Sequence, residues 1–255
     1  MRGIFVTGTD TNVGKTVVAA ALMLRYRDEA ALRYWKPVQT GIEQDDDTRE
    51  VVRLIGGADL SGPRRSEEVL RCGVRLPGLL SPHLAARRAG TRITVQSLVE
   101  TLHSADLKIR AVHDIRAAHD AESRIPNPES RHRWVVEGAG GALVPLNERE
   151  TMADLMHALD LPVLIAARST LGTINHTCMT IEVLRRRMLR VAGVVMVGDC
   201  DRSPTMALAA SGASALASPK SSTFTVPSAR TLMLAGLRSR WTIPLPCAAD
   251  SADAS

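Results

Sequence analysis

The residues that could do chemistry begin near the amino terminus, in the stretch GTDTNVGKT at residues 8–16. The apolar run IFVT at 4–7 precedes this stretch, and a long apolar segment suited to a helix follows it. A strand that turns through such a loop into a helix directs backbone N–H groups and the positive end of the helix at one point. This arrangement is typical of a site that binds a chain of phosphates.

Three consecutive residues at the end of this loop have different roles in such a site. Gly14 allows the backbone to approach the phosphates closely, Lys15 reaches the β- and γ-phosphates, and the Thr16 hydroxyl is a ligand for Mg²⁺. The common spacing G-x-x-x-x-G-K-[ST] would place a glycine where Thr9 stands, so the loop is a variant of that pattern. The alternative is a tight turn with a chance Gly-Lys-Thr, which the strand–loop–helix context disfavours.

Magnesium-dependent phosphoryl transfer also needs carboxylates that share the ion. Glu137 lies at the end of the apolar run WVVEG, and strand ends line the ligand crevice of a parallel sheet. Asp47 is a second candidate metal ligand, directly before a predicted helix. Both have structural alternatives, because Glu137 could cap a helix at a surface turn and Asp47 could belong to an N-cap cluster.

A second lysine, Lys36 in WKPVQTG at 35–41, stands at the end of another predicted strand, with Thr40 and Gly41 in the following loop. Two ammonium groups that converge on one anionic centre would stabilise a transition state with charge on both reactants. The alternative is a surface lysine beside a proline turn.

These residues have to be positioned by alternating strands and helices. Short apolar runs predict strands at 4–7, 34–38, 134–138, 162–167 and 191–197. Helical patterns lie between and after them, at 15–27, 46–56, 94–103, 151–159 and 173–189. The alternation predicts an α/β fold with a mostly parallel central sheet flanked by helices, of the P-loop NTPase type.

The composition excludes several other classes of protein. Aromatic residues make up only 3% of the chain, so the net charge of +5 does not indicate an aromatic platform for nucleic acid. No apolar run reaches membrane-spanning length. The four cysteines are far apart and the amino terminus begins directly in a predicted strand, so we expect reduced thiols in a cytoplasmic protein.

We expect one P-loop ATPase or synthetase domain at residues 1–204. Within this domain, the polar segment 104–133 reads as a helix followed by a surface loop, and is interpreted as a surface insertion. Residues 205–255 are rich in Ala and Ser and are expected to be a diverged, partly disordered C-terminal segment.

Together these motifs identify a resemblance to a known family. GTDTNVGKT, KPVQTG, SPHLAARRAG, VVEGAGGALVPL, TMADL and LPVLIAARSTLGTINHTCMT occur in the order found in dethiobiotin synthetases. The resemblance covers roughly residues 1–103 and 134–200. It implies that 7,8-diaminononanoate, CO2 and ATP are converted with Mg²⁺ to dethiobiotin, ADP and phosphate, through a carbamate and a carbamic–phosphoric anhydride.

The resemblance also implies roles for individual residues and a homodimer with shared active sites. Lys36 and Lys15 would be catalytic, and Thr16, Asp47 and Glu137 would bind the metal. The nucleotide would be bound by Asn12, Val13, Gly14, Lys15, Thr16, Val17, Asp47, Glu137, Gly138, Ala139, Gly140, Asn175 and His176. The substrate would be bound by Thr11, Thr40, Thr151 and Met152. Asn175 would read adenine, although a helix-cap or core role is the alternative.

Two rival hypotheses remain from the sequence alone. One is a regulatory ATPase switch of the partitioning type, which would carry a second lysine where this chain has Asp10. The other is an inactive homologue that acts as a binding module, because the segment after residue 205 lacks the family's expected strand. The loop also departs from the family at Asn12, where glutamate is common.

Overall fold

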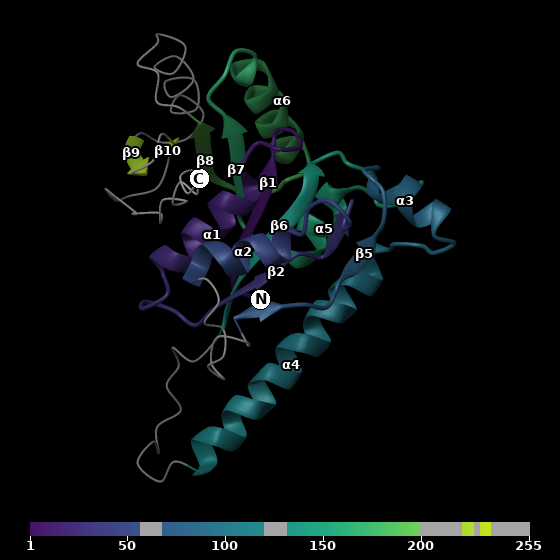
Figure 1. Cartoon of the computed structure of the whole chain (residues 1–255), viewed down its shortest axis with the longest axis vertical. Helices are drawn as coiled ribbons and strands as arrows, with labels where there is room; N and C mark the ends of the chain where they lie inside the picture. Colours follow the sequence, from purple (N-terminus) through teal and green to yellow (C-terminus); the bar gives the residue numbers. More distant parts are fainter. Residues whose placement is uncertain (57–67, 120–131, 199–220, 227–229, 236–255) are drawn as a thin grey trace, which may run out of the picture.

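The computed structural model describes residues 1–56, 68–119, 132–198, 221–226 and 230–235, and the statements below concern these residues. An eight-stranded sheet forms the centre of the molecule, with helices on both of its faces (Figure 1). Its strands follow the order β4-β2-β6-β1-β7-β8-β10-β9. All neighbours from β4 to β8 are parallel, whereas β10 is antiparallel to both β8 and β9, so the prediction of a mostly parallel sheet is confirmed.

The strands are short and rich in apolar residues, as expected for a sheet that is covered on both faces. The strands of the main sheet are β1 (Gly3–Gly8), β2 (Leu32–Trp35), β4 (Val69–Leu70), β6 (Arg133–Gly141), β7 (Val163–Arg168), β8 (Val191–Gly198), β9 (Ser221–Val226) and β10 (Arg230–Ala235). A separate two-stranded parallel sheet consists of β3 (Val38–Thr40) and β5 (Val74–Leu76).

Six helices are described, and several begin at recognisable signals. They are α1 (Lys15–Arg25), α2 (Asp47–Gly56), α3 (Pro82–Arg88), α4 (Val95–His119), α5 (Met152–Leu159) and α6 (Thr173–Arg186). Among them, α3 has proline at its first position, and α1 and α6 each follow a left-handed glycine. None of the described helices is both long and apolar enough to span a lipid bilayer.

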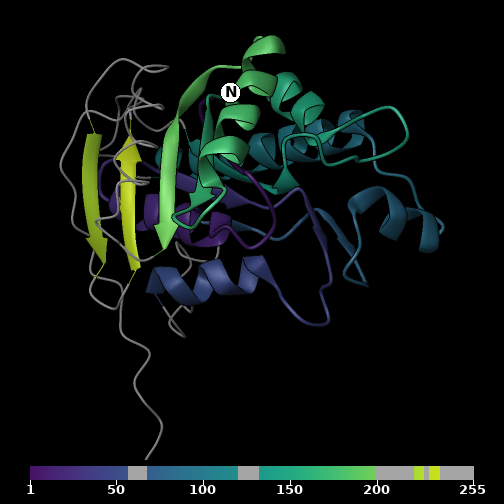
Figure 2. The same cartoon turned by 90° about the horizontal axis from the view of Figure 1, so that it is seen from above.

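The two faces of the sheet pack into two separate cores. On β1, Phe5 and Val6 point to opposite faces, as successive residues of a strand must. Val6, Tyr34 and Val135 pack with α1 and α2, whereas Phe5 and its neighbours pack with helices α3 to α6. Figure 2 shows α2 (blue) and α6 (green) on opposite sides of the sheet.

The order of the parallel strands brings the predicted site residues to one edge of the sheet. Parallel strands end at the same edge, and here β1 lies between β6 and β7 while β6 also pairs with β2. The register pairs Val6 with Glu137 and Tyr34 with Val135. The phosphate loop, Lys36 and Glu137 therefore come from three adjacent strands.

Several predicted elements differ from those observed. The single strand expected at 34–38 is two strands in different sheets, because Pro37 has no N–H with which to continue a ladder. The helix expected at 94–103 continues to His119, and so includes the first half of segment 104–133. The sequence did not predict α3, β4, β5, β9 or β10.

The domain boundaries stay predictions. Residues 120–131 of the proposed insertion lie outside the described residues, as does the proposed division after residue 204. Within 205–255, β9 and β10 extend the sheet beyond β8, and the remaining residues of that segment are not among those described.

Candidate phosphate-binding and catalytic site

The phosphate loop connects β1 to α1 and has a tightly constrained backbone. Asn12 and Gly14 both have positive φ angles, 54° and 89°. Asparagine tolerates this left-handed conformation better than most residues, which gives a local reason for Asn12. A Cβ atom on Gly14 would lie 2.6 Å from Cγ1 of Val197 on β8, so this position requires glycine for both conformation and space.

The helix that follows the loop presents its positive end to the same region. α1 begins at Lys15, and the N–H groups in the first turn of a helix have no carbonyl partner within that helix. They and the helix dipole favour a bound anion. The loop expected for phosphates therefore has the strand–loop–helix geometry that was predicted.

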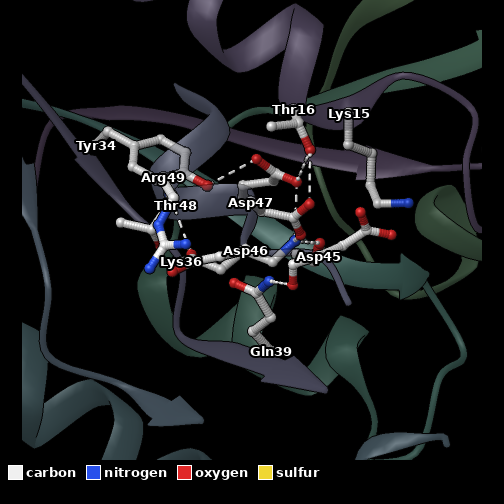
Figure 3. A network of polar contacts seen from close by, with 12 residues as sticks. Lys15, Thr16, Tyr34, Lys36, Gln39, Asp45, Asp46, Asp47, Thr48 and Arg49 are labelled. Carbon is white, nitrogen blue, oxygen red and sulfur yellow. Dashed lines mark hydrogen bonds and ion pairs between the residues drawn. The ribbon is translucent and has the colours of Figure 1, made fainter. Parts of the chain in front are cut away.

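A compact network of charged and hydroxyl groups lies beside this loop (Figure 3). The ammonium of Lys36 lies 2.5 Å from Oδ2 of Asp47 and 2.8 Å from Oε1 of Glu137. Oγ1 of Thr16 lies 3.1 Å from Oδ1 of Asp47 and 3.0 Å from Oε1 of Glu137. Four predicted site residues from four separate elements or loops thus meet in one place.

Lys15 interacts electrostatically with the charged groups of this network. Its ammonium donates to the carbonyl oxygen of Asp10, 2.8 Å away, across the phosphate loop. Burial, and next the positive charge of Lys36, lower the pKa of Lys15 to about 8, although Glu137 and Asp47 act in the opposite direction. The two ammonium groups are therefore close enough to influence each other.

The pKa values of the other groups reflect their pairing. Burial alone would lower the pKa of Lys36, but the charges of Glu137 and Asp47 outweigh burial and raise it. Burial alone would raise the pKa of Asp47, but Lys36 outweighs burial and holds it below its usual range. Lys36 therefore stays an ammonium and Asp47 a carboxylate at neutral pH.

The oxygen atoms of this network fit a magnesium ion. Thr16, Asp47 and Glu137 supply a hydroxyl and two carboxylates, which are the hard oxygen donors that Mg²⁺ prefers. Within the described residues, no group of three or more His, Cys, Asp or Glu side chains is arranged to hold a metal. Two carboxylates suffice for an ion that takes its remaining ligands from water and substrate phosphates.

Three residues that the sequence analysis missed support the network. The Tyr34 hydroxyl donates to Oε2 of Glu137 at 2.8 Å. Arg75 donates to the carbonyl oxygen of Lys36 and to Oγ1 of Thr48 at 2.9 and 3.0 Å. Gln39 donates to the carbonyl oxygen of Asp45 at 2.6 Å and so holds the loop before Asp47. For Tyr34, the period of two along a strand was an available signal, because Tyr34 and Lys36 are two residues apart.

Other predicted residues lie around this centre. Gly138 accepts a hydrogen bond from Lys36 at 3.2 Å through its carbonyl oxygen. A Cβ atom on Gly140 would lie 3.9 Å from Oγ1 of Thr11, so the loop after Glu137 approaches the phosphate loop. Ala139 and Thr40 are half-buried, at the end regions of β6 and β3. Of the remaining loop and helix residues, Val13 is buried and Val17 half-buried.

The start of α5 does not join the network. Met152 is fully buried in the core, and its amide donates to the carbonyl oxygen of Val144 at 2.9 Å. The amide of Thr151 donates to Oδ2 of Asp154 at 2.7 Å. A substrate carboxylate at these amides would have to replace bonds within the chain, so this expected role stays a prediction.

Asn175 and His176 lie on α6, which supplies none of the charged groups of this network. Both are exposed in the first turn of α6, which follows β7. The amide of His176 donates to the carbonyl oxygen of Gly172 at 3.3 Å. Their predicted contact with the nucleotide is not tested by these bonds.

Comparison with known proteins identifies the family of this chain. Residues 2–219 match a family model described as an AAA domain. The chain is 44% identical over 199 residues to an ATP-dependent dethiobiotin synthetase of Paramagnetospirillum magneticum, covering 78% of each protein. It is also 38% identical to those of Agrobacterium fabrum and Bradyrhizobium diazoefficiens, over 77% and 78% of this chain and 75% and 76% of theirs. The chain therefore belongs to the family of ATP-dependent dethiobiotin synthetases.

Proposed function

We propose that this protein converts 7,8-diaminononanoate, CO2 and ATP into dethiobiotin, ADP and phosphate. The observation that carries the proposal is the meeting of Lys36, Asp47, Glu137 and Thr16 beside the phosphate loop, with Lys36 within 2.8 Å of both carboxylates. The reaction is inferred from membership of the family, and the charged and hydroxyl groups of the network are suited to that reaction.

The reaction brings two anions together. One amine of the substrate attacks CO2 and loses a proton, which forms a carbamate. A carbamate oxygen then attacks the γ-phosphorus of ATP, and the bond from that phosphorus to the bridging oxygen breaks to release ADP. The second amine attacks the carbonyl carbon of the mixed anhydride and loses a proton, so the ring closes and phosphate leaves.

The positive charges of the two lysines would offset the repulsion between carbamate and triphosphate. Lys15, at the start of α1, would bind the β- and γ-phosphates, and Lys36 would stabilise the charge that builds up on the transferred phosphoryl group and the carbamate. The glutamate and aspartate would hold Lys36 in position while the loop amides bind phosphate oxygens. No side chain has to form a covalent bond, because catalysis here is positioning and charge neutralisation.

The metal ion and its ligands are part of the proposal. Thr16, Asp47 and Glu137 would hold Mg²⁺, which would neutralise charge on the phosphates when bound. Thr11, Thr40, Thr151 and Met152 would contact the diamine. Asn175 and His176 would contact the nucleotide base.

Assembly and location are further parts of the proposal. A homodimer with shared active sites is what the family resemblance implies. A cytoplasmic location is supported by Cys72 and Cys178, which are exposed free thiols of a kind that reducing conditions preserve.

The partitioning-type switch has no observation in its favour. Such a switch needs a lysine at position 10, and Asp10 instead forms an ion pair with Arg168 at 2.9 Å. No family comparison above points to that class.

The direct test supplies ATP, Mg²⁺, bicarbonate and the diamine to the purified full-length protein, follows ADP, and identifies the product by mass. We expect ADP release to depend on both the diamine and bicarbonate, with one dethiobiotin formed per ADP. ADP release at the same rate without the diamine would reject the synthetase function and favour a simple ATPase.

A further inference from the structure

Tyr34 is a buried polar residue to which the reaction above gives no task. It is fully buried on β2, and its hydroxyl donates to Oε2 of Glu137 at 2.8 Å. The other oxygen of the same carboxylate, Oε1, is the one near Lys36 and Thr16, at 2.8 and 3.0 Å. The two oxygens of Glu137 therefore have different partners on different sides.

The sheet register explains this division. Tyr34 pairs with Val135, so Lys36 and Glu137, each two residues further along, lie at neighbouring positions on the same face. Tyr34 thus lies one step further into the sheet than Lys36, and its hydroxyl contacts the Glu137 carboxylate. The Tyr34 hydroxyl contacts Oε2 of Glu137, and Oε1 contacts Lys36 and Thr16.

Burial makes the position of the carboxylate depend on this bond. Glu137 is completely buried, so water cannot replace a missing donor at Oε2. Without the phenol, the carboxylate would turn about its last side-chain torsion to find another donor, and Oε1 would move relative to Lys36 and Thr16. A shift of this kind would weaken the binding of the metal ion and change the position of the Lys36 ammonium.

We propose that Tyr34 is a positioning residue that fixes the orientation of the Glu137 carboxylate for the metal ion and for Lys36. The inference rests on the proposed function, because Glu137 is assigned to the metal there. It extends that function by adding a residue that acts through its hydrogen bond to Glu137.

The test compares Tyr34→Phe with a matched control, Trp134→Phe. Tyr34→Phe keeps the packing of the ring and removes only the hydroxyl. Trp134 is also fully buried, on β6, and donates from Nε1 to Oδ1 of Asp106 at 3.0 Å, so its variant loses a buried bond to a different carboxylate. Thermal unfolding of both variants reports the cost of each change to the fold.

Two readouts separate positioning from stability. For Tyr34→Phe we expect the Mg²⁺ concentration for half-maximal activity to rise about tenfold and kcat to fall about tenfold, as loss of one hydrogen bond to a charged group predicts, with little change in KM for the diamine. We also expect weaker binding of Mn²⁺ to the protein with a non-hydrolysable ATP analogue, measured by electron paramagnetic resonance. Trp134→Phe should lower the unfolding temperature and leave the cation dependence at the wild-type value.

A double-mutant cycle with Glu137→Gln provides the second variant. If Tyr34 acts through Glu137, its replacement should change Mn²⁺ binding little once Glu137 is already glutamine. Tyr34→Phe with wild-type Mg²⁺ dependence and wild-type Mn²⁺ binding would overturn the proposal, as would equal effects of Tyr34→Phe in both backgrounds. The Mn²⁺ measurement needs no diamine, so it remains decisive even if the synthetase assay fails.

Discussion

Lys36 is 1% exposed, and its ammonium contacts two carboxylates, those of Asp47 and Glu137. We expect Lys36→Ala to lower turnover by at least ~100-fold, the scale of losing one preorganised charge contact in a transition state. Lys15→Ala should have a loss of the same order, since its charge would face the phosphates of bound ATP. Steady-state ADP release in the presence of the diamine measures both effects.

Lys108→Ala is the matched control, because Lys108 is exposed on α4 and should leave the rate unchanged. Unfolding measurements must accompany the Lys36 variant, since removal of the lysine leaves two carboxylates facing each other. Turnover of Lys36→Ala equal to wild type, in a folded protein, would contradict the assigned role.

Lys15 gives a pH-dependent prediction. Its pKa of about 8 in the protein without nucleotide is below the ordinary value of 10.5. Triphosphate charges favour the ammonium and so raise this pKa, and ATP binding near pH 8.5 should therefore take up a substantial fraction of a proton. At pH 7 Lys15 is already protonated, so uptake by this group should be close to zero.

Calorimetry in two buffers of different ionisation enthalpy measures this uptake. Lys15→Arg should bind ATP without the difference between pH 7 and 8.5, because arginine stays charged at both. An uptake that persists in the arginine variant would show that another group is responsible. Without nucleotide, charged Lys15 costs stability below pH 8, and this cost fades as the pH rises from 8 toward 10.5.

The sequence identified the charged residues of the site but not their supports. Lys15, Thr16, Lys36, Asp47 and Glu137 belong to motifs whose spacing indicates phosphate chemistry, and the structure brings all five together. Tyr34 contacts a residue 103 positions away, and that contact depends on the register between β2 and β6. The period of two placed Tyr34 on the same face as Lys36. The pairing register that brings Tyr34 to Glu137 cannot be read from either strand alone, so the support was missed.

At the scale of elements, the sequence predicted the strand and helix order around the site but not every boundary. Apolar runs flanked by loops located β1, β6, β7 and β8 to within a few residues. The prediction of a single strand at 34–38 was wrong because Pro37 interrupts the backbone hydrogen-bond ladder directly after Lys36. That interruption ends β2 at Trp35, so Lys36 lies between the last residue of β2 and the start of β3.

The end of α6 contains a residue in an unfavourable conformation. Met188 has a φ of 59° and is 85% exposed, two residues after the last helical position. A left-handed conformation costs a residue with a side chain about 1 kcal/mol or more, whereas glycine adopts it freely. We expect Met188→Gly to raise the free energy of unfolding by about 0.5–1 kcal/mol, after allowing for the greater freedom of glycine in the unfolded chain.

Denaturant unfolding monitored by circular dichroism measures this difference. Met179→Gly is the control, since Met179 is also exposed but lies inside α6, where glycine should destabilise by about 1 kcal/mol. A Met188→Gly variant no more stable than wild type would mean that the surrounding chain already relieves the strain.

At the scale of the whole molecule, the proposed homodimer can be tested by mass. We expect sedimentation to give twice the chain mass of 27.5 kDa. Leu143 is 52% exposed in the turn after β6, close to the site, and an exposed large apolar residue there suits an interface between copies. Leu143→Asp should weaken self-association at least tenfold, because a charge would be buried on pairing.

Leu107→Asp is the control for this change. Leu107 is 67% exposed on α4, which supplies none of the site residues named above, and its variant should sediment as wild type does. A wild-type protein that sediments as a single chain at micromolar concentration would reject the homodimer.

The main sheet ends in a very short strand on one side, since β4 contributes only Val69 and Leu70 to its pairing with β2. Fibril growth and edge-to-edge clumping need a long row of free backbone groups on which another chain can assemble. Among the described residues, the two of β4 offer almost none, so β4 itself is a poor template for aggregation. The same shortness disfavours a merger of the sheets of two molecules across β4, and a contact between them at β4 would have to rely on side chains.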